Sequence, residues 1–169
     1  MVGKKIKMKI SEKAIALACG VAIVAVCFSS EAKAQDGQLS VIVHTVSKHS
    51  ATPDGYKFNE INPGAALKLQ LNQDWSLQAG GYRNSYYKPT VYAVAQYTPL
   101  HIGNVSVGAF AGLASGYAHV SQLNVGKASV VGGFYAVAQF DNLSVAVRAV
   151  PKITPKQAGV ATLEFGYKF

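Results

Sequence analysis

Hydrophobic and polar residues alternate along most of the chain after residue 38, in short segments separated by turn residues. In one of these segments, Trp75, Leu77 and Ala79 alternate with Ser76 and Gln78. A period of two residues is typical of a β-strand that buries one face. The same alternation predicts eight strands, at about 39–49, 61–72, 75–86, 90–99, 104–117, 127–140, 143–150 and 158–169.

Short and long connections alternate between these predicted strands. The connections at 72–74, 99–103 and 141–142 are short, whereas those at 50–60, 86–89, 118–126 and 151–157 are mostly longer and richer in Pro, Lys, His and Ser. An even number of strands can close a meander without free edges, and short turns at one end with longer loops at the other are typical of outer-membrane barrels. We therefore predict an all-β fold, an eight-stranded antiparallel up-and-down transmembrane β-barrel.

The faces of the predicted strands favour this barrel over a secreted β-sandwich or a lipocalin-like barrel. On the last strand, Leu163, Phe165 and Tyr167 share one face, and an unbroken apolar face recurs in other strands. The opposite faces hold long polar side chains, which suit a lumen where they can pair with one another. Arg148 and Glu164 lie on neighbouring predicted strands, so we expect an ion pair that offsets two buried charges. The polar residues of these faces are Lys68, Gln70, Gln78, Gln96, Gln139, Arg148 and Glu164.

The first 34 residues predict a secretory signal peptide. A lysine-rich start is followed by an apolar run of fifteen residues, 14–28, and by the small residues Ala32 and Ala34 of an A-x-A cleavage site. The run is shorter than the ~20 residues that a membrane-spanning helix needs. We therefore expect a signal peptide at 1–34 and a barrel domain at 35–169. Cys19 and Cys27 both lie in the signal peptide, so the mature chain is expected to carry no thiol.

Charge and motifs exclude several classes of function. The full chain has a net charge of +8, and removing the six Lys and two Glu of the signal peptide leaves ten basic and six acidic residues, a net charge of +4. This small positive net charge gives no reason to expect a nucleic-acid partner, although it suits binding to an anionic lipid surface. No H-E-x-x-H motif, cysteine set or carboxylate cluster is present in the mature sequence, so we expect neither a metal nor another cofactor. A monomer is expected.

Four histidines are candidates for chemistry in the mature chain. His44 falls inside the first predicted strand, on the face opposite Val43. His49, His101 and His119 lie at or near strand ends, and we expect them to be solvated. Ser85 has no G-x-S-x-G surroundings, so its immediate neighbours do not mark it as a nucleophile.

The landmarks between His44 and Phe169 nevertheless resemble the lipid A palmitoyltransferases (PagP), eight-stranded outer-membrane enzymes that move an acyl chain from a phospholipid to lipid A. The match is one of order and motif more than of identity. It comprises His44 in V-H-T-V, the loop residues 56–60 ending in Asn-Glu, Asp74-Trp75, the segment 82–86 with Asn84-Ser85, the Thr-Pro-Leu of 98–100, Val150-Pro151 and the aromatic last strand.

The resemblance implies a cofactor-free acyltransferase of the bacterial outer membrane, with a phospholipid and lipid A as its partners. His44 would be the general base, and Ser85 the hydroxyl that attacks the ester or stabilises the oxyanion. Asn84 occupies the place of the family's carboxylate, and an amide can orient a histidine but cannot offset its positive charge. Glu60 or Asp54 could supply a carboxylate instead.

Two further departures from the family shape the expected function. The segment after the expected cleavage site leads almost directly into the first predicted strand, so we expect no counterpart of the family's N-terminal amphipathic helix. Family enzymes measure the acyl chain against a small residue on the floor of the barrel, where this chain has Tyr92. If Tyr92 points inward, we expect an acyl chain shorter than palmitate or no transfer. The alternatives are a non-catalytic barrel with a structural or loop-mediated interaction role, and a hydrolase that uses the same His and Ser.

Overall fold

The computed structural model describes residues 37–50, 55–118, 123–153 and 158–169. The signal peptide expected at 1–34 lies outside these residues and stays a prediction. Within the described residues, no helix is both long enough and apolar enough to cross a membrane.

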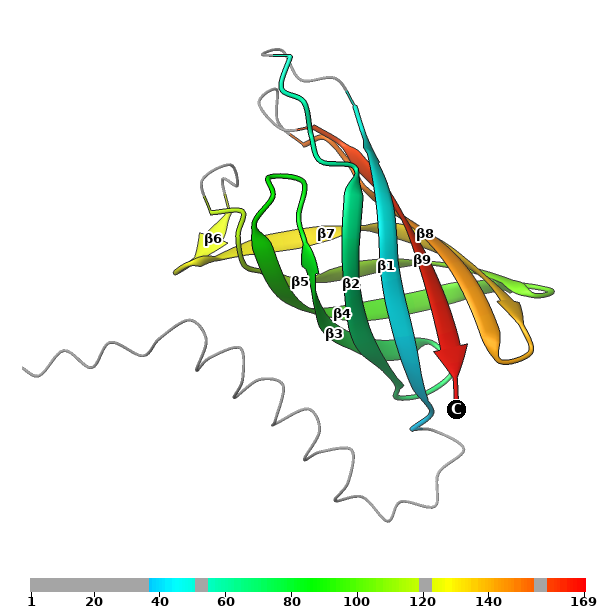
Figure 1. Ribbon diagram of the computed structural model, residues 1–169. Coiled ribbons are helices and arrows are strands. Elements are labelled where there is room, and N and C mark those ends of the chain that lie inside the picture. Colours follow the sequence, from blue (N-terminus) through cyan, green and yellow to red (C-terminus); the bar gives the residue numbers. More distant parts are fainter. Residues whose placement is uncertain (1–36, 51–54, 119–122, 154–157) are drawn as a thin grey trace, which may run out of the picture. The chain divides into compact units, whose positions relative to one another are not determined.

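The described residues form a closed antiparallel β-barrel (Figure 1). Each long strand pairs with its neighbours in the sequence, and the pairings of β1 with β9 and of β5 with β7 close the ring. The two-residue strand β6 extends only the loop end of β7. The strands are β1 Leu39–His49, β2 Ile61–Gln70, β3 Trp75–Arg83, β4 Pro89–Ile102, β5 Val105–Ala114, β6 Asn124–Val125, β7 Ala128–Phe140, β8 Leu143–Val150 and β9 Val160–Lys168. Leaving β6 aside, eight strands form the barrel, as the alternating pattern predicted.

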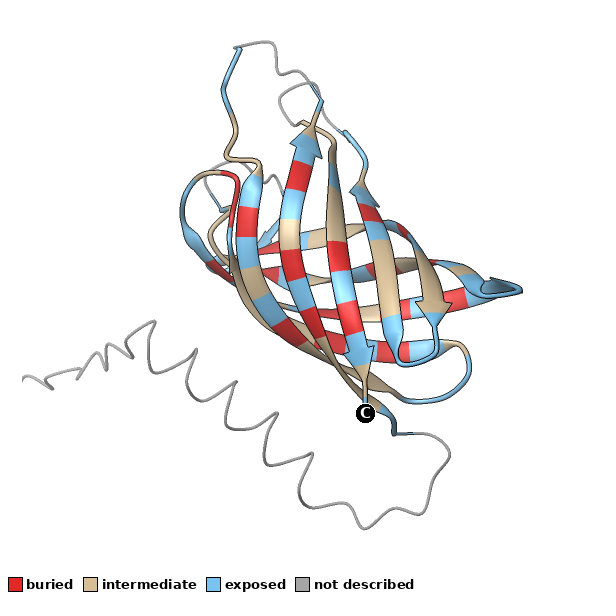
Figure 2. Ribbon diagram, turned by 45° about the vertical axis from the view of Figure 1, so that its right-hand side comes forward, coloured by how far each residue is buried: buried red, intermediate tan, exposed pale blue. Residues whose placement is uncertain are grey.

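Burial follows the expected two-residue period along the barrel wall (Figure 2). On β9, Phe165 and Tyr167 are 46% and 44% exposed, whereas Glu164 between Leu163 and Phe165 is only 4% exposed. Polar side chains thus lie inside the barrel, and large apolar side chains cover its outside. This arrangement suits hydrocarbon as the surrounding medium, because closure leaves no strand edge unpaired.

The two ends of the barrel differ. Short turns at 71–74, 103–104 and 141–142 lie at one end, which we call the turn end. The chain terminus is also there, because the Phe169 N–H donates to the Leu39 carbonyl at 3.1 Å. The longer connections lie at the opposite end, the loop end (Figure 1). On the outside of the turn end, the rings of Trp75 and Tyr97 pack with centroids 4.8 Å apart, as is typical of an aromatic girdle.

A β-bulge at Thr45 decides which residues of β1 face the lumen. His44 pairs with Glu164 and Val46 with Leu163, so Thr45 is an extra residue in the strand. Beyond such a bulge the alternation restarts with the opposite phase. Val46 therefore faces outward, at 45% exposure, while His44 and Ser47 are both buried inside.

Candidate functional site

A layer of hydrogen-bonded polar side chains crosses the barrel near its middle. Its centre is the ion pair between Arg148 and Glu164, with Arg148 Nε 2.8 Å from Glu164 Oε1. Arg148 Nη2 also donates to Gln78 Oε1 at 2.5 Å, and Gln96 Nε2 donates to the same oxygen at 2.7 Å. The predicted Arg148–Glu164 pair is thus confirmed. We call this layer the polar septum; it consists of His44, Gln78, Tyr92, Gln96, Arg148 and Glu164.

His44 belongs to this septum, with a partner at each ring nitrogen. Nδ1 lies 3.2 Å from Glu164 Oε1, and Nε2 lies 2.7 Å from the Tyr92 hydroxyl. That hydroxyl also accepts a hydrogen bond from Gln78 Nε2 at 2.7 Å. Both ring nitrogens of His44 are therefore engaged within the septum. The carboxylate beside His44 is that of Glu164. No sequence motif indicated that these two residues are in contact.

Two cavities lie on either side of the septum, and both are lined by Arg148 and Glu164. The loop-end cavity has a volume of about 230 Å³ and mostly apolar walls that include Val94 and Phe110. The turn-end cavity, about 370 Å³, is lined largely by Gln, Ser and Lys side chains. The lumen is therefore an apolar chamber and a polar chamber, separated by one layer of side chains.

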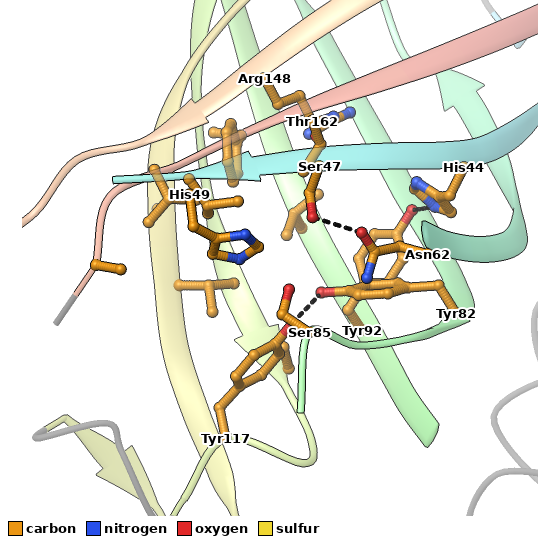
Figure 3. A pocket seen from close by; sticks show the side chains of 18 of the residues that line it. His44, Ser47, His49, Asn62, Tyr82, Ser85, Tyr92, Tyr117, Arg148 and Thr162 are labelled. Carbon is orange, nitrogen blue, oxygen red and sulfur yellow. Dashed lines mark hydrogen bonds between the residues drawn. The ribbon is translucent and has the colours of Figure 1, made fainter. Parts of the chain in front are cut away.

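Tyr92 points inward and forms part of the floor of the loop-end cavity, as Figure 3 shows. It pairs with Gly80, three residues from Arg83 at the loop end of β3. Three residues of antiparallel strand rise about 10 Å. Tyr92 therefore lies about 10 Å along the strand from the loop end of β3.

Ser85 lies in the wall of the loop-end cavity, just beyond the end of β3. It is 6% exposed, and its carbonyl accepts the Asn59 N–H at 3.0 Å. Its hydroxyl has no hydrogen-bond partner among the described residues, and no hydrogen bond joins it to His44. Ser85 and His44 therefore line the same cavity but do not share a proton in this structure.

Asn84 is fully buried and holds the turn between β3 and β4 together. Its Oδ1 accepts the N–H groups of Tyr86 and Lys88, at 2.9 and 3.0 Å. Its Nδ2 donates to Thr90 Oγ1 at 3.0 Å and to the Gly116 carbonyl at 3.4 Å. A carboxylate could accept the first two bonds but could not donate to Gly116. This donor requirement explains why an amide stands at this position.

Of the four residues proposed for the site, the structure thus brings His44 and Tyr92 into contact in the septum and leaves Asn84 and Ser85 at the rim. Glu60 does not replace the carboxylate at Asn84, because it lies at the surface. There it pairs with Lys48 at 3.1 Å, and this bond lowers the pKa of Glu60. Asp54 lies outside the described residues.

A cluster of aromatic side chains, which no sequence pattern indicated, lies at the rim beside Ser85. The ring of His49 stacks on Phe58 with centroids 4.2 Å apart and 16° between planes, so His49 lines the cavity instead of being solvated as predicted. Tyr86 also lines the cavity and packs against Phe58 and Tyr117. Burial raises the pKa of both Tyr86 and Tyr117, so these hydroxyls stay protonated.

His101 is not part of the loop-end cavity. His101 is exposed at the turn end, where it bonds Ser106 at 2.9 Å and lies 3.6 Å from Asp74. His119 lies outside the described residues. Within the described part of the chain, no group of three or more His, Cys, Asp or Glu side chains could hold a metal ion.

No family model and no curated protein matches the sequence. Among solved structures, a de novo designed transmembrane β-barrel matches with a TM-score of 0.58 at 14% identity, over 82% of this chain and all of that one. The designed barrel TMB2.3 matches with a TM-score of 0.54 at 14% identity, over 82% of this chain and 98% of that one. The outer-membrane protein Ail of Yersinia pestis gives 0.43 at 18% identity, over 80% of this chain and all of that one.

The likeness to the two designed barrels shows the fold alone, and it agrees with the closed ring of strands. The chain has the fold of an eight-stranded antiparallel transmembrane β-barrel.

Proposed function

We propose that the protein is a lipid acyltransferase of the bacterial outer membrane, which takes an acyl chain of a phospholipid into the loop-end cavity and transfers it to lipid A. The observation that carries this proposal is the apolar cavity itself. It lies in the loop-end half of the barrel, ends on a polar floor and has the free hydroxyl of Ser85 in its wall. Such a chamber with few polar groups is typical of a site for an apolar ligand.

The position of the cavity supports a lipid substrate. In outer-membrane barrels the longer loops face the outside, so the loop-end cavity would lie at the depth of the outer leaflet. A lipid in that leaflet could place one acyl chain between Val94, Phe110 and the other apolar side chains, with its ester group near the rim. Because Tyr92 points inward and closes the chamber from below, we expect an acyl chain shorter than palmitate.

Ser85 would then act as the nucleophile at the rim. Its Oγ attacks the ester carbonyl of the phospholipid, the lysophospholipid alcohol leaves, and the acyl chain is held as an ester of Ser85. A hydroxyl of lipid A attacks this ester in a second step and releases Ser85. Hydrolysis would follow the same course with water as the acceptor.

A second candidate is a non-catalytic barrel with a structural or loop-mediated role. A specific observation favours it. The ring nitrogens of His44 are bonded within the septum, and the side-chain amide of Asn84 is bonded within the β3–β4 turn and to its neighbours. The trio that the family resemblance implies is therefore not assembled around Ser85.

The mass spectrum of lipid A from cells that express the protein distinguishes the two candidates. We expect a species heavier by one acyl chain, absent when Ser85→Ala is expressed. Ser144→Ala is a matched control, because Ser144 faces the lumen in the turn-end cavity. Unchanged lipid A in the presence of folded barrel would reject the transferase and leave the non-catalytic role.

A further inference from the structure

His49 stands at the rim with an unused ring nitrogen. The bulge at Thr45 turns this last residue of β1 toward the cavity, and the stack on Phe58 holds its ring there. Nδ1 of His49 is buried and has no hydrogen-bond partner among the described residues. A buried nitrogen without a hydrogen-bond partner lowers the stability of the folded protein. Its presence at the rim therefore favours a functional role for His49.

Ser85 is tied to the same part of the rim. The residue after Phe58, Asn59, donates its N–H to the Ser85 carbonyl at 3.0 Å. The Phe58 ring also packs on Tyr86, the residue after Ser85, with centroids 5.6 Å apart. The segment that stacks on His49 therefore also binds the backbone of Ser85. Figure 3 shows both side chains projecting into the cavity.

The rim around these two side chains is braced by Asn62. Ser47 Oγ donates to Asn62 Oδ1 at 2.5 Å, and Asn62 Nδ2 donates to the Arg83 carbonyl at 3.0 Å. These bonds join the loop ends of β1, β2 and β3, which carry His49 and lead to Ser85. A pair of reacting groups on such a braced rim keeps its relative position.

From this geometry we infer that His49 is the general base for Ser85, within the proposed acyl transfer on which this inference rests. His44 lies deeper, on the cavity floor, with both ring nitrogens bonded to other members of the septum. It has no free nitrogen for the proton of Ser85. His49 has one, at the same rim as the hydroxyl.

The proton path balances over the two steps. As Ser85 Oγ bonds to the ester carbon, its proton passes to the His49 imidazole. The imidazolium returns this proton to the leaving alcohol of the lysophospholipid when the ester C–O bond breaks. In the second step His49 takes the proton of the lipid A hydroxyl and gives it to Ser85 Oγ as the acyl chain leaves.

Labelling by an alkyl fluorophosphonate tests the pair without requiring acyl transfer. The full barrel, folded in phospholipid bilayers, is treated with the probe, and the rate of covalent labelling at Ser85 is measured. We expect His49→Gln to slow labelling by about 100-fold, the lower range for loss of a general base. His44→Gln should slow it less than tenfold, and His101→Gln, at the exposed turn end, should leave it unchanged. Resistance to unfolding in detergent confirms that each variant is folded.

The outcomes separate this inference from the proposed function. Equal labelling of the wild type and His49→Gln, a larger effect of His44→Gln, or no labelling of Ser85 in the wild type would overturn the inference. Labelling that depends on His49, together with unchanged lipid A, would preserve the pair and reject the transferase. Acyl transfer that survives in His49→Gln would preserve the transferase and reject His49 as its base.

Discussion

Removing the charge of Glu164 tests the energetics of the septum. Glu164 is 4% exposed, and its Oε1 lies 2.8 Å from Arg148 Nε and 3.2 Å from His44 Nδ1. Glu164→Gln keeps the shape of the side chain but leaves the guanidinium of Arg148 buried without its counter-charge. Breaking a buried ion pair from one side costs about 3–5 kcal/mol.

The surroundings of Arg148 place the expected cost near the lower end of this range. Its guanidinium carbon lies 4.9 Å from the ring centre of Phe110 and 5.5 Å from that of Tyr135. Cation–π contacts of this kind contribute roughly 0.5–2 kcal/mol. Gln78 also keeps its hydrogen bond to Nη2. We therefore expect Glu164→Gln to lower the free energy of unfolding by about 3 kcal/mol.

Reversible unfolding by guanidinium chloride in phospholipid vesicles measures this loss. Trp75 is the only tryptophan and lies on the outside of the turn end, so its fluorescence reports insertion without a further label. The double variant Arg148→Met, Glu164→Gln should lose less than the sum of the single variants, because it leaves no unpaired charge. Lys168→Met is a control: Lys168 also lines the turn-end cavity, and it has no ion-pair partner within 4 Å among the described residues.

A loss below about 1 kcal/mol in Glu164→Gln, or additive losses in the double variant, would contradict a stabilising role of the ion pair. Either result would mean that water in the turn-end cavity solvates Arg148, so that the pair does not hold the septum together.

Two further substitutions test the turn and the floor. Asn84→Asp should lower the free energy of unfolding by about 1–3 kcal/mol, because it removes the donor to the Gly116 carbonyl. The same vesicle assay measures this loss, and a gain in acyl transfer would contradict the structural role assigned to the amide. Tyr92→Ala should deepen the loop-end cavity, so that the acyl chain found on lipid A by mass spectrometry becomes longer than in the wild type. An unchanged chain length would show that Tyr92 does not set the depth of this cavity.

The sequence sufficed for the strands and their faces, because the two-residue period follows directly from the geometry of a half-buried strand. It also sufficed for the Arg148–Glu164 pair, since both residues fall on lumen faces of consecutive strands. The register that sets Glu164 against His44 depends on how the first and last strands meet when the barrel closes, and no local pattern encodes that offset.

The rim could not be derived in the same way. A simple alternation through β1 would place Val46 inside with His44, and the bulge at Thr45 is what brings Ser47 and His49 into the lumen instead. The role of Asn84 was hidden for a similar reason, because one of its partners is the carbonyl of Gly116 in another loop. Contacts that depend on a bulge or on the meeting of two loops leave no periodic signal in the sequence.

An acyl-transfer reaction with defined lipids tests the proposed function most directly. Purified barrel is folded into bilayers of lipid A and phospholipids that carry lauroyl, myristoyl or palmitoyl chains, and the lipid A is analysed by mass spectrometry. We predict that lipid A gains one acyl chain shorter than palmitoyl, and that Ser85→Ala abolishes the gain. No acylated lipid A from the folded wild type would contradict the proposed function, and palmitoyl as the sole product would contradict a floor at Tyr92.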